Sequence, residues 1–186
     1  MERTLVLEEN MMKSSLQYLG YGSHIIALLP CIHWTQGPIL EVGAGYYSTA
    51  LISLYSHTRY CRTMESDRLW LEKVKNFFPA FCDLSQNTGH DFQHVEDYRN
   101  AIMEDHAWDI VFIDQGDYHS RAETAQRMKD LSRLVIMHDT ETEGLNAAME
   151  GYRFRYDLKS ILPYTSIGSQ VDDLTWLEEI LKAYAD

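Results

Sequence analysis

Two glycines and a carboxylate in the first part of the sequence have the spacing of a nucleoside-binding site. Ile39–Val42 reads as a short buried strand that runs into a turn with Gly43 and Gly45, and a helix should follow. Glycines there let the backbone turn sharply and approach a ligand, while the free amide groups of the helix point at the same place. Glu65 ends the next expected strand, 20 residues after Gly45, where a carboxylate can accept both ribose hydroxyls.

Glu41 helps to decide which nucleoside would bind. It is a carboxylate at the end of a buried strand, two residues before the first glycine, so it needs a cationic or hydrogen-bonding partner. A carboxylate here would repel the pyrophosphate that dinucleotide sites bring to this turn, and Tyr47 replaces their third glycine. We therefore expect a ligand with an ammonium group and no phosphate, such as S-adenosylmethionine (SAM).

The residues from Glu41 to Ser48 resemble a motif of a known family. They are similar to the first motif of the class I SAM-dependent methyltransferases, written Glu/Asp-x-Gly-x-Gly-x-Gly, with Tyr47 in place of the third glycine. The resemblance covers most of the chain, from about residue 20 to residue 169. It implies a SAM site formed by Glu41, Gly43, Ala44, Gly45, Tyr47, Ser48, Glu65, Ser66, Asp97, Tyr98 and Asp114.

Asp97 follows the third expected strand. In this family a carboxylate there often holds the adenine amino group, while a neighbouring side chain, here Tyr98, covers the ring. Asp97 could equally cap a helix that begins after it, and the two roles are compatible. Glu65 also has a simpler alternative, as a solvated charge at the end of its strand.

Asp114 and Asp139 end the fourth and fifth expected strands, which are neighbours in this fold. Their carboxylates should converge beside the SAM sulfonium, and such oxygen ligands suit Mg²⁺ or another hard divalent cation. The pattern resembles metal-dependent small-molecule O-methyltransferases, in which acids after these strands hold the cation that binds the substrate oxygens. His138 or Glu141 would complete the set. Alternatively, Asp114 is a solvated polar wall and Asp139 a turn residue.

His119 follows Asp114 by five residues, at the start of an expected helix. Its surroundings resemble the Ile-Asp-Gly-x-His run of small SAM enzymes that act on sugars and natural products, with a longer turn here. It could be the general base for a hydroxyl, because imidazole titrates near neutral pH, or it could pack or cap a helix. His24 and the remaining histidines have no spacing that suggests a site, and we expect them to be structural or exposed.

The composition is that of one globular domain. The chain has 186 residues, of which 45% are hydrophobic and 24% charged. We expect a single domain over 1–186, with N-terminal helices or a lid over 1–36 and a Rossmann-like core over 37–186. The net charge of −12 disfavours nucleic-acid and anionic membrane partners. Three scattered cysteines and no signal-peptide pattern fit a cytoplasmic protein.

Strand-like runs alternate with helical runs, which is typical of a mostly parallel sheet. Strands are expected at 39–42, 59–65, 92–95, 108–114 and 133–137, and helices at 23–33 (capped by Ser23), 47–56, 67–78, 99–104, 120–131 and 144–149. Two strands at 152–158 and 164–169 have so short a connection that they must be antiparallel. A last helix from 172 or 173 should bury Leu174, Leu177, Leu181 and Tyr184. These elements predict an α/β three-layer Rossmann-like sandwich with a seven-stranded, mostly parallel sheet.

We therefore expect a methyltransferase that acts on a small molecule, with a hydroxyl oxygen favoured by Asp114, Asp139 and His119 as catalytic residues. No Asn/Asp-Pro-Pro-Tyr motif follows the fourth strand, so methylation of a nucleic-acid base is disfavoured. A second subunit could close the pocket in a homodimer. The alternatives are a non-catalytic relative that binds SAM or a partner protein and, less favoured, an NAD-dependent oxidoreductase.

Overall fold

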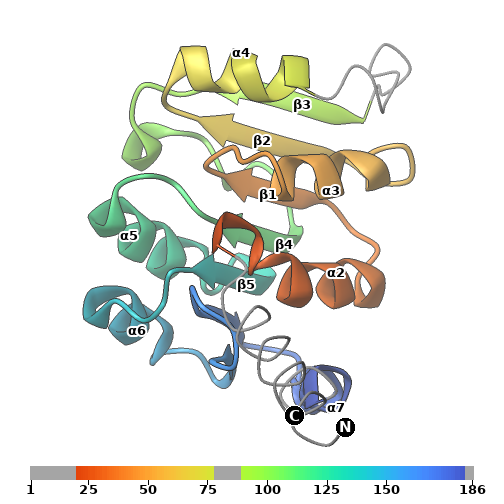
Figure 1. The fold of residues 1–186 in the computed structure, drawn as a ribbon, viewed down its shortest axis with the longest axis vertical. Coiled ribbons are helices and arrows are strands. Elements are labelled where there is room, and N and C mark those ends of the chain that lie inside the picture. The colour runs from red at the N-terminus through yellow and green to blue at the C-terminus, as the bar shows by residue number, and fades with distance from the viewer. Residues whose placement is uncertain (1–19, 78–88, 183–186) are drawn as a thin grey trace, which may run out of the picture.

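A twisted sheet lies at the centre of the molecule, with helices on both faces (Figure 1). The computed structural model describes residues 20–77 and 89–182, and within them the sheet has seven strands in the order β3-β2-β1-β4-β5-β7-β6. Strands β1 to β5 run parallel, and β7 is antiparallel to both β5 and β6. The strands are β1 (Ile39–Val42), β2 (Cys61–Glu65), β3 (His90–His94), β4 (Trp108–Ile113), β5 (Ser132–His138), β6 (Phe154–Leu158) and β7 (Thr165–Ser169).

The central strands are buried on both faces, so successive apolar side chains feed two separate cores. Leu40 and Val111 pack on one face under α5 and α6, while Ile39 and Ile110 pack on the other under α2, α3 and α7. The helices are η1 (Gly20–Gly22), α2 (Ile25–Trp34), α3 (Ser48–Tyr55), α4 (Arg68–Phe77), η3 (Tyr98–Asn100), α5 (Tyr118–Met128), α6 (Glu143–Met149) and α7 (Thr175–Leu181).

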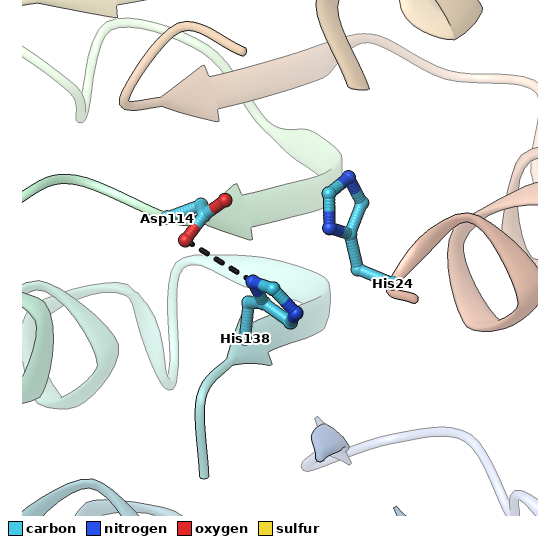
Figure 2. Close-up of side chains that lie close together, drawn as sticks. All are labelled: His24, Asp114 and His138. Carbon is cyan, nitrogen blue, oxygen red and sulfur yellow. Dashed lines mark hydrogen bonds and ion pairs between the residues drawn. The ribbon is translucent and has the colours of Figure 1, made fainter. Parts of the chain in front are cut away.

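The strand order reverses between β1 and β4, which is where open α/β sheets bind their ligands. The Asp114 N–H donates to the Val42 carbonyl at 2.8 Å, so the chain after β4 lies directly beside the turn after β1. His138 ends the neighbouring β5, and His24 immediately precedes α2. Figure 2 shows that the side chains of Asp114, His138 and His24 gather at this edge of the sheet.

The predicted sheet and its terminal antiparallel pair are confirmed, and β1 matches the prediction residue for residue. Strand β3 begins at His90, two residues before the expected start. The prediction missed these residues because the edge strand is half-buried throughout and its polar residues give no clear hydrophobic pattern. The helix expected at 99–104 is only the short turn η3. Cys82, Tyr184 and the expected lid up to residue 19 lie outside the described residues.

The C-terminal helix α7 closes one of the two cores. Leu174, Leu177 and Leu181 are all buried, as predicted. In the described part of the chain, no helix has both the length and the apolar character that crossing a membrane requires.

Candidate functional site

The turn after β1 is built around Gly43. This residue has a φ of +94°, and a Cβ on it would lie 2.4 Å from the backbone nitrogen of Gln115. Only glycine satisfies both conditions. The next glycine, Gly45, donates its N–H to the Thr49 hydroxyl of α3 at 3.0 Å. The turn therefore needs glycine at 43 because it packs against the chain that follows β4.

Glu41 lies behind this turn and is completely buried. Its Oε2 accepts hydrogen bonds from the hydroxyls of Thr49 at 2.7 Å and Thr63 at 2.6 Å. Burial raises the pKa of Glu41 from 4.5 to about 7, with nearby hydroxyls, including that of Ser48, opposing the rise. Direct pairing of Glu41 with a ligand ammonium, as its position in the sequence suggested, is not available to a side chain without exposed surface. The carboxylate instead ties the turn to α3 and β2.

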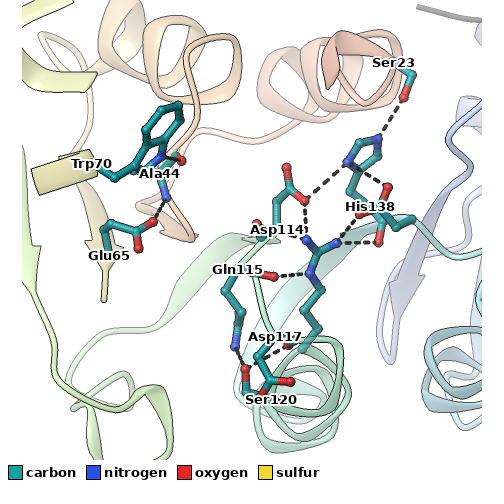
Figure 3. Close-up of polar contacts among 11 residues, drawn as sticks. Ser23, Ala44, Glu65, Trp70, Asp114, Gln115, Asp117, Ser120 and His138 are labelled. Atoms are coloured by element: carbon teal, nitrogen blue, oxygen red, sulfur yellow. Dashed lines mark hydrogen bonds and ion pairs between the residues drawn. The ribbon is translucent and has the colours of Figure 1, made fainter. Parts of the chain in front are cut away.

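Glu65 connects the end of β2 to the glycine turn. Its Oε2 accepts the Ala44 N–H at 2.9 Å, and its Oε1 accepts the N–H groups of Ser66 at 2.7 Å and Asp67 at 2.8 Å. Trp70, on the first turn of α4, donates its indole N–H to the Ala44 carbonyl at 2.7 Å (Figure 3). Because Oε2 accepts one hydrogen bond from the described residues, it keeps a lone pair for a ligand hydroxyl.

Two cavities lie beside the hydrogen-bond partners of Glu65. The first has a volume of about 390 Å³, the second about 350 Å³. Glu65 is hydrogen-bonded to a wall residue of each, Ala44 in the first and Ser66 in the second. Residues that line the first include His24, Ala44, Gly45, Tyr47, Trp70 and Asp114, and those that line the second include Ser66, Asp97, Tyr98, Asp117 and His119.

Asp97 fills the capping role that was one of its two predictions. Its carboxylate accepts the Arg99 N–H at 3.0 Å and pairs with the Arg99 guanidinium at 2.8 Å, contacts that lower the pKa of Asp97. Tyr98 is buried, and its hydroxyl accepts the Ser66 N–H at 3.1 Å. The adenine role of Asp97 stays a prediction, and it requires Arg99 to share or release the carboxylate.

Asp114 and Asp139 lie close together, as predicted, but Arg121 contacts both. The buried Arg121 guanidinium of α5 is 3.0 Å from Asp114 Oδ1 and 2.6 Å from Asp139 Oδ2. Glu141 is exposed and accepts the Tyr164 N–H at 2.9 Å instead. The structure therefore revises the expected Mg²⁺ ligand set, because Asp139 pairs with the buried Arg121 guanidinium and Glu141 bonds to the Tyr164 N–H.

His138 is buried beside the two carboxylates (Figure 3). Its Nδ1 is 3.3 Å from Asp114 Oδ1 and 3.6 Å from Asp139 Oδ1, and its Nε2 is 2.8 Å from Ser23 Oγ. Ser23 was expected to cap the first helix. It instead contacts His138 and donates its hydroxyl to the Pro163 carbonyl at 2.9 Å.

His24 is a site residue that the sequence analysis did not single out. It is 2% exposed, lines the first cavity, and its ring centroid lies 4.7 Å from that of His138. Neither ring nitrogen has a hydrogen-bond partner among the described residues. Burial, helped by the nearby His138 and Arg121, lowers the pKa of His24 well below 6.5, so the ring is neutral at neutral pH. Such an orphaned buried imidazole is a candidate metal ligand or proton acceptor.

His119 lies apart from the Asp114 cluster. Asp117 caps α5 by accepting the N–H groups of His119 at 3.2 Å and Ser120 at 3.1 Å. The capped turn leaves the His119 side chain 81% exposed and 3.2 Å from Glu123, one turn further on. His119 lines the second cavity and not the first, and its role as a general base stays a prediction.

Comparisons with known proteins identify the fold. No protein-family model and no curated protein match the sequence. A Staphylococcus aureus protein provisionally identified as a caffeoyl-CoA O-methyltransferase superposes with a TM-score of 0.60 and 16% identity, over 88% of this chain and 90% of that chain. Spermidine synthase from Thermotoga maritima superposes with a TM-score of 0.58 and 13% identity, over 81% of this chain and 60% of that chain. A Thermoplasma acidophilum protein provisionally identified as a methyltransferase superposes with a TM-score of 0.54 and 15% identity, over 70% of this chain and 66% of that chain.

This chain thus spans less than two thirds of the length of the last two proteins. At identities this low, the superpositions establish the fold alone, which is that of the class I SAM-dependent methyltransferases. The chemistry has to be argued from the site.

Proposed function

We propose that this chain transfers a methyl group from SAM to a small-molecule acceptor, with a hydroxyl oxygen as the atom that receives it. The observation that carries the proposal is the pair of cavities beside the partners of Glu65, one against the glycine turn and one against the residues after β3. SAM, when bound, supplies a methyl group on a positively charged sulfur. The protein's own contribution is then to hold and orient SAM and the acceptor, and to deprotonate the acceptor.

The recognition of SAM is divided among the strand ends. The spare lone pair of Glu65 Oε2 suits a ribose hydroxyl. The glycine turn and Trp70 suit the amino-acid end of the ligand in the first cavity, and Asp97 with Tyr98 suits the adenine in the second. Glu41 acts from behind the turn, by fixing its shape.

The charges of the cavities fit a cationic ligand better than a pyrophosphate. The described lining of the first cavity contains Asp114 and no lysine or arginine. Arg99 lines the second, but it is paired with Asp97. A pyrophosphate would therefore bring negative charge to a site without a free cation, which disfavours an NAD-dependent oxidoreductase.

Asp114 is the best-placed group to receive the proton of an acceptor. Its Oδ1 faces Arg121 and His138, while Oδ2 has no hydrogen bond or ion pair within the described residues. Because Asp114 lines the first cavity, Oδ2 can accept a hydrogen bond from a hydroxyl held there. The net charge of −12 supports a small acceptor over a nucleic acid.

Transfer of a labelled methyl group tests this function. Incubated with labelled SAM, the protein should methylate compounds in a small-molecule extract and leave DNA and RNA unlabelled. Asp114→Asn should lose the transfer and keep its affinity for S-adenosylhomocysteine, while Asp130→Asn, at an exposed position, should behave as wild type. Label in nucleic acid alone would contradict the proposal. Binding of S-adenosylhomocysteine without transfer to any pool would favour the non-catalytic alternative.

A further inference from the structure

Three side chains from separate parts of the fold lie close together (Figure 2), and two of them, His24 and Asp114, line the first cavity. His24 precedes α2, Asp114 follows β4, and His138 ends β5. One nitrogen of each ring and one carboxylate oxygen all lie within 4.8 Å of one another. Two of the three residues are buried, and Asp114 is partly exposed on the cavity side.

The hydrogen bonds of His138 leave one ring nitrogen facing only acceptors. Ser23 has a single hydroxyl hydrogen and donates it to the Pro163 carbonyl, so Ser23 Oγ must accept a hydrogen from His138 Nε2. Nδ1 then points at carboxylate oxygens of Asp114, 3.3 Å away, and Asp139, 3.6 Å away. A lone pair against two carboxylates is repulsive, so a positive species, either a proton or a metal ion, has to lie at Nδ1.

The unpartnered ring of His24 favours a metal ion over a proton. Asp114, Asp139 and Arg121, when ionised, sum to one net negative charge in a largely buried cluster. A proton on His138 would balance that charge but would leave both ring nitrogens of His24 without a partner. A divalent metal ion at this point would offset the negative charge, leaving one net positive charge, and would use His24 as well.

The geometry points to a divalent transition-metal site formed by His24, Asp114 and His138, and we propose that it binds an ion of the zinc, cobalt or ferrous type. Two imidazoles and one carboxylate match the preferences of these ions, whereas Mg²⁺ prefers oxygen ligands throughout. Bonds of about 2.1 Å place neighbouring ligand atoms about 3–3.6 Å apart. His138 Nδ1 and Asp114 Oδ1 already have that separation, and a His24 nitrogen belongs to the set of ligand atoms that lie within 4.8 Å of one another.

Neighbouring groups support the ligands in the way metal sites require. The Nε2–H of His138 is fixed by Ser23, which orients the ring and selects the nitrogen that binds the ion. Arg121 pairs with Asp114 Oδ1 and so fixes the carboxylate, while Oδ2 has no partner within the described residues. The remaining coordination positions would face the first cavity, where an acceptor oxygen could bind. The site itself does not depend on the proposed methyl transfer and can be tested without it.

Metal titration of the full chain tests the proposal. Co²⁺ should bind one equivalent and give visible d–d absorption, Zn²⁺ should displace it, and Mg²⁺ should do neither. His24→Ala should weaken Zn²⁺ binding at least about 10-fold by calorimetry, and His57→Ala, which replaces an exposed histidine, should not. Zn²⁺ should also raise the Tm of the wild type more than that of His24→Ala.

Three results would overturn the proposal. They are no binding of Co²⁺ or Zn²⁺ to the wild type, binding that survives His24→Ala unchanged, and equal loss in His24→Ala and His57→Ala. Circular dichroism of each variant shows whether it is folded. Should His24→Ala fail to fold, Asp114→Asn must show the same loss of Zn²⁺ binding. Because these readouts use no SAM, a failure here leaves the proposed function standing, and the reverse also holds.

Discussion

Replacing Glu41 with glutamine should change how the stability of the protein depends on pH. Glu41 is completely buried, and burial raises its pKa to about 7 in the folded chain, against an ordinary value of 4.5. Between these two pH values the folded state keeps a proton that the unfolded state has released. The free energy of unfolding contributed by this group therefore falls as the pH rises through that window.

The size of the effect follows from the two pKa values. Below pH 4.5 the carboxyl is protonated in both states, and above pH 7 it is ionised in both, so the whole change lies between them. It corresponds to about 3 kcal/mol. Glutamine carries no charge at any pH and can still accept from Thr49 and Thr63. Each buried amide hydrogen left without an acceptor costs about 1–3 kcal/mol, but that cost does not vary with pH.

Chemical denaturation of wild type and Glu41→Gln from pH 4.5 to pH 8 measures the effect. The difference between their free energies of unfolding should shift by about 3 kcal/mol in favour of the glutamine variant as the pH rises. Glu72→Gln, at an exposed position on α4, should show no such shift. A difference between wild type and Glu41→Gln that stays constant over this range would refute the assignment of the raised pKa to burial.

Two further substitutions test the ends of β1 and β2. Gly43→Ala should destabilise the fold by about 3 kcal/mol or more, because its φ of +94° and its approach to Gln115 exclude a side chain. Gly116→Ala is the control, because a Cβ at Gly116 would have no neighbour within 4 Å. An equal loss of Tm in both variants would contradict the steric requirement for glycine at 43. Glu65→Gln should weaken binding of S-adenosylhomocysteine by about 1–3 kcal/mol, because an amide replaces a charged acceptor beside the Ala44 N–H. Unchanged affinity by calorimetry would exclude Glu65 from the site.

The fold could be predicted because its signals are local. The run from Ile110 to Ile113 is apolar on both faces, as central parallel strands are, and the glycine turn after Val42 marks the first crossover. Acids after successive strands had to meet at one edge of the sheet. Asp114 and Asp139 accordingly share Arg121 as a partner.

The partners of those acids could not be predicted, since they depend on contacts between distant elements. Arg121 is an ordinary helix residue in the sequence, and only the packing of α5 on β4 and β5 brings it between the carboxylates. His24 stands alone before α2, with no spacing that relates it to a strand. Ser23 could be interpreted as a helix cap, but its partner His138 is 115 residues away. The Ser23 hydroxyl takes part in this buried long-range hydrogen bond instead of capping the helix, and local sequence rules cannot predict such a partner.

Calorimetric titration of the wild-type chain with S-adenosylhomocysteine and, separately, with NAD tests the central claim most directly. The two cavities beside the hydrogen-bond partners of Glu65, which offer no free cation in their described lining, predict that S-adenosylhomocysteine binds with one-to-one stoichiometry and that NAD gives no measurable heat at the same concentrations. Binding of NAD without binding of S-adenosylhomocysteine would contradict the account.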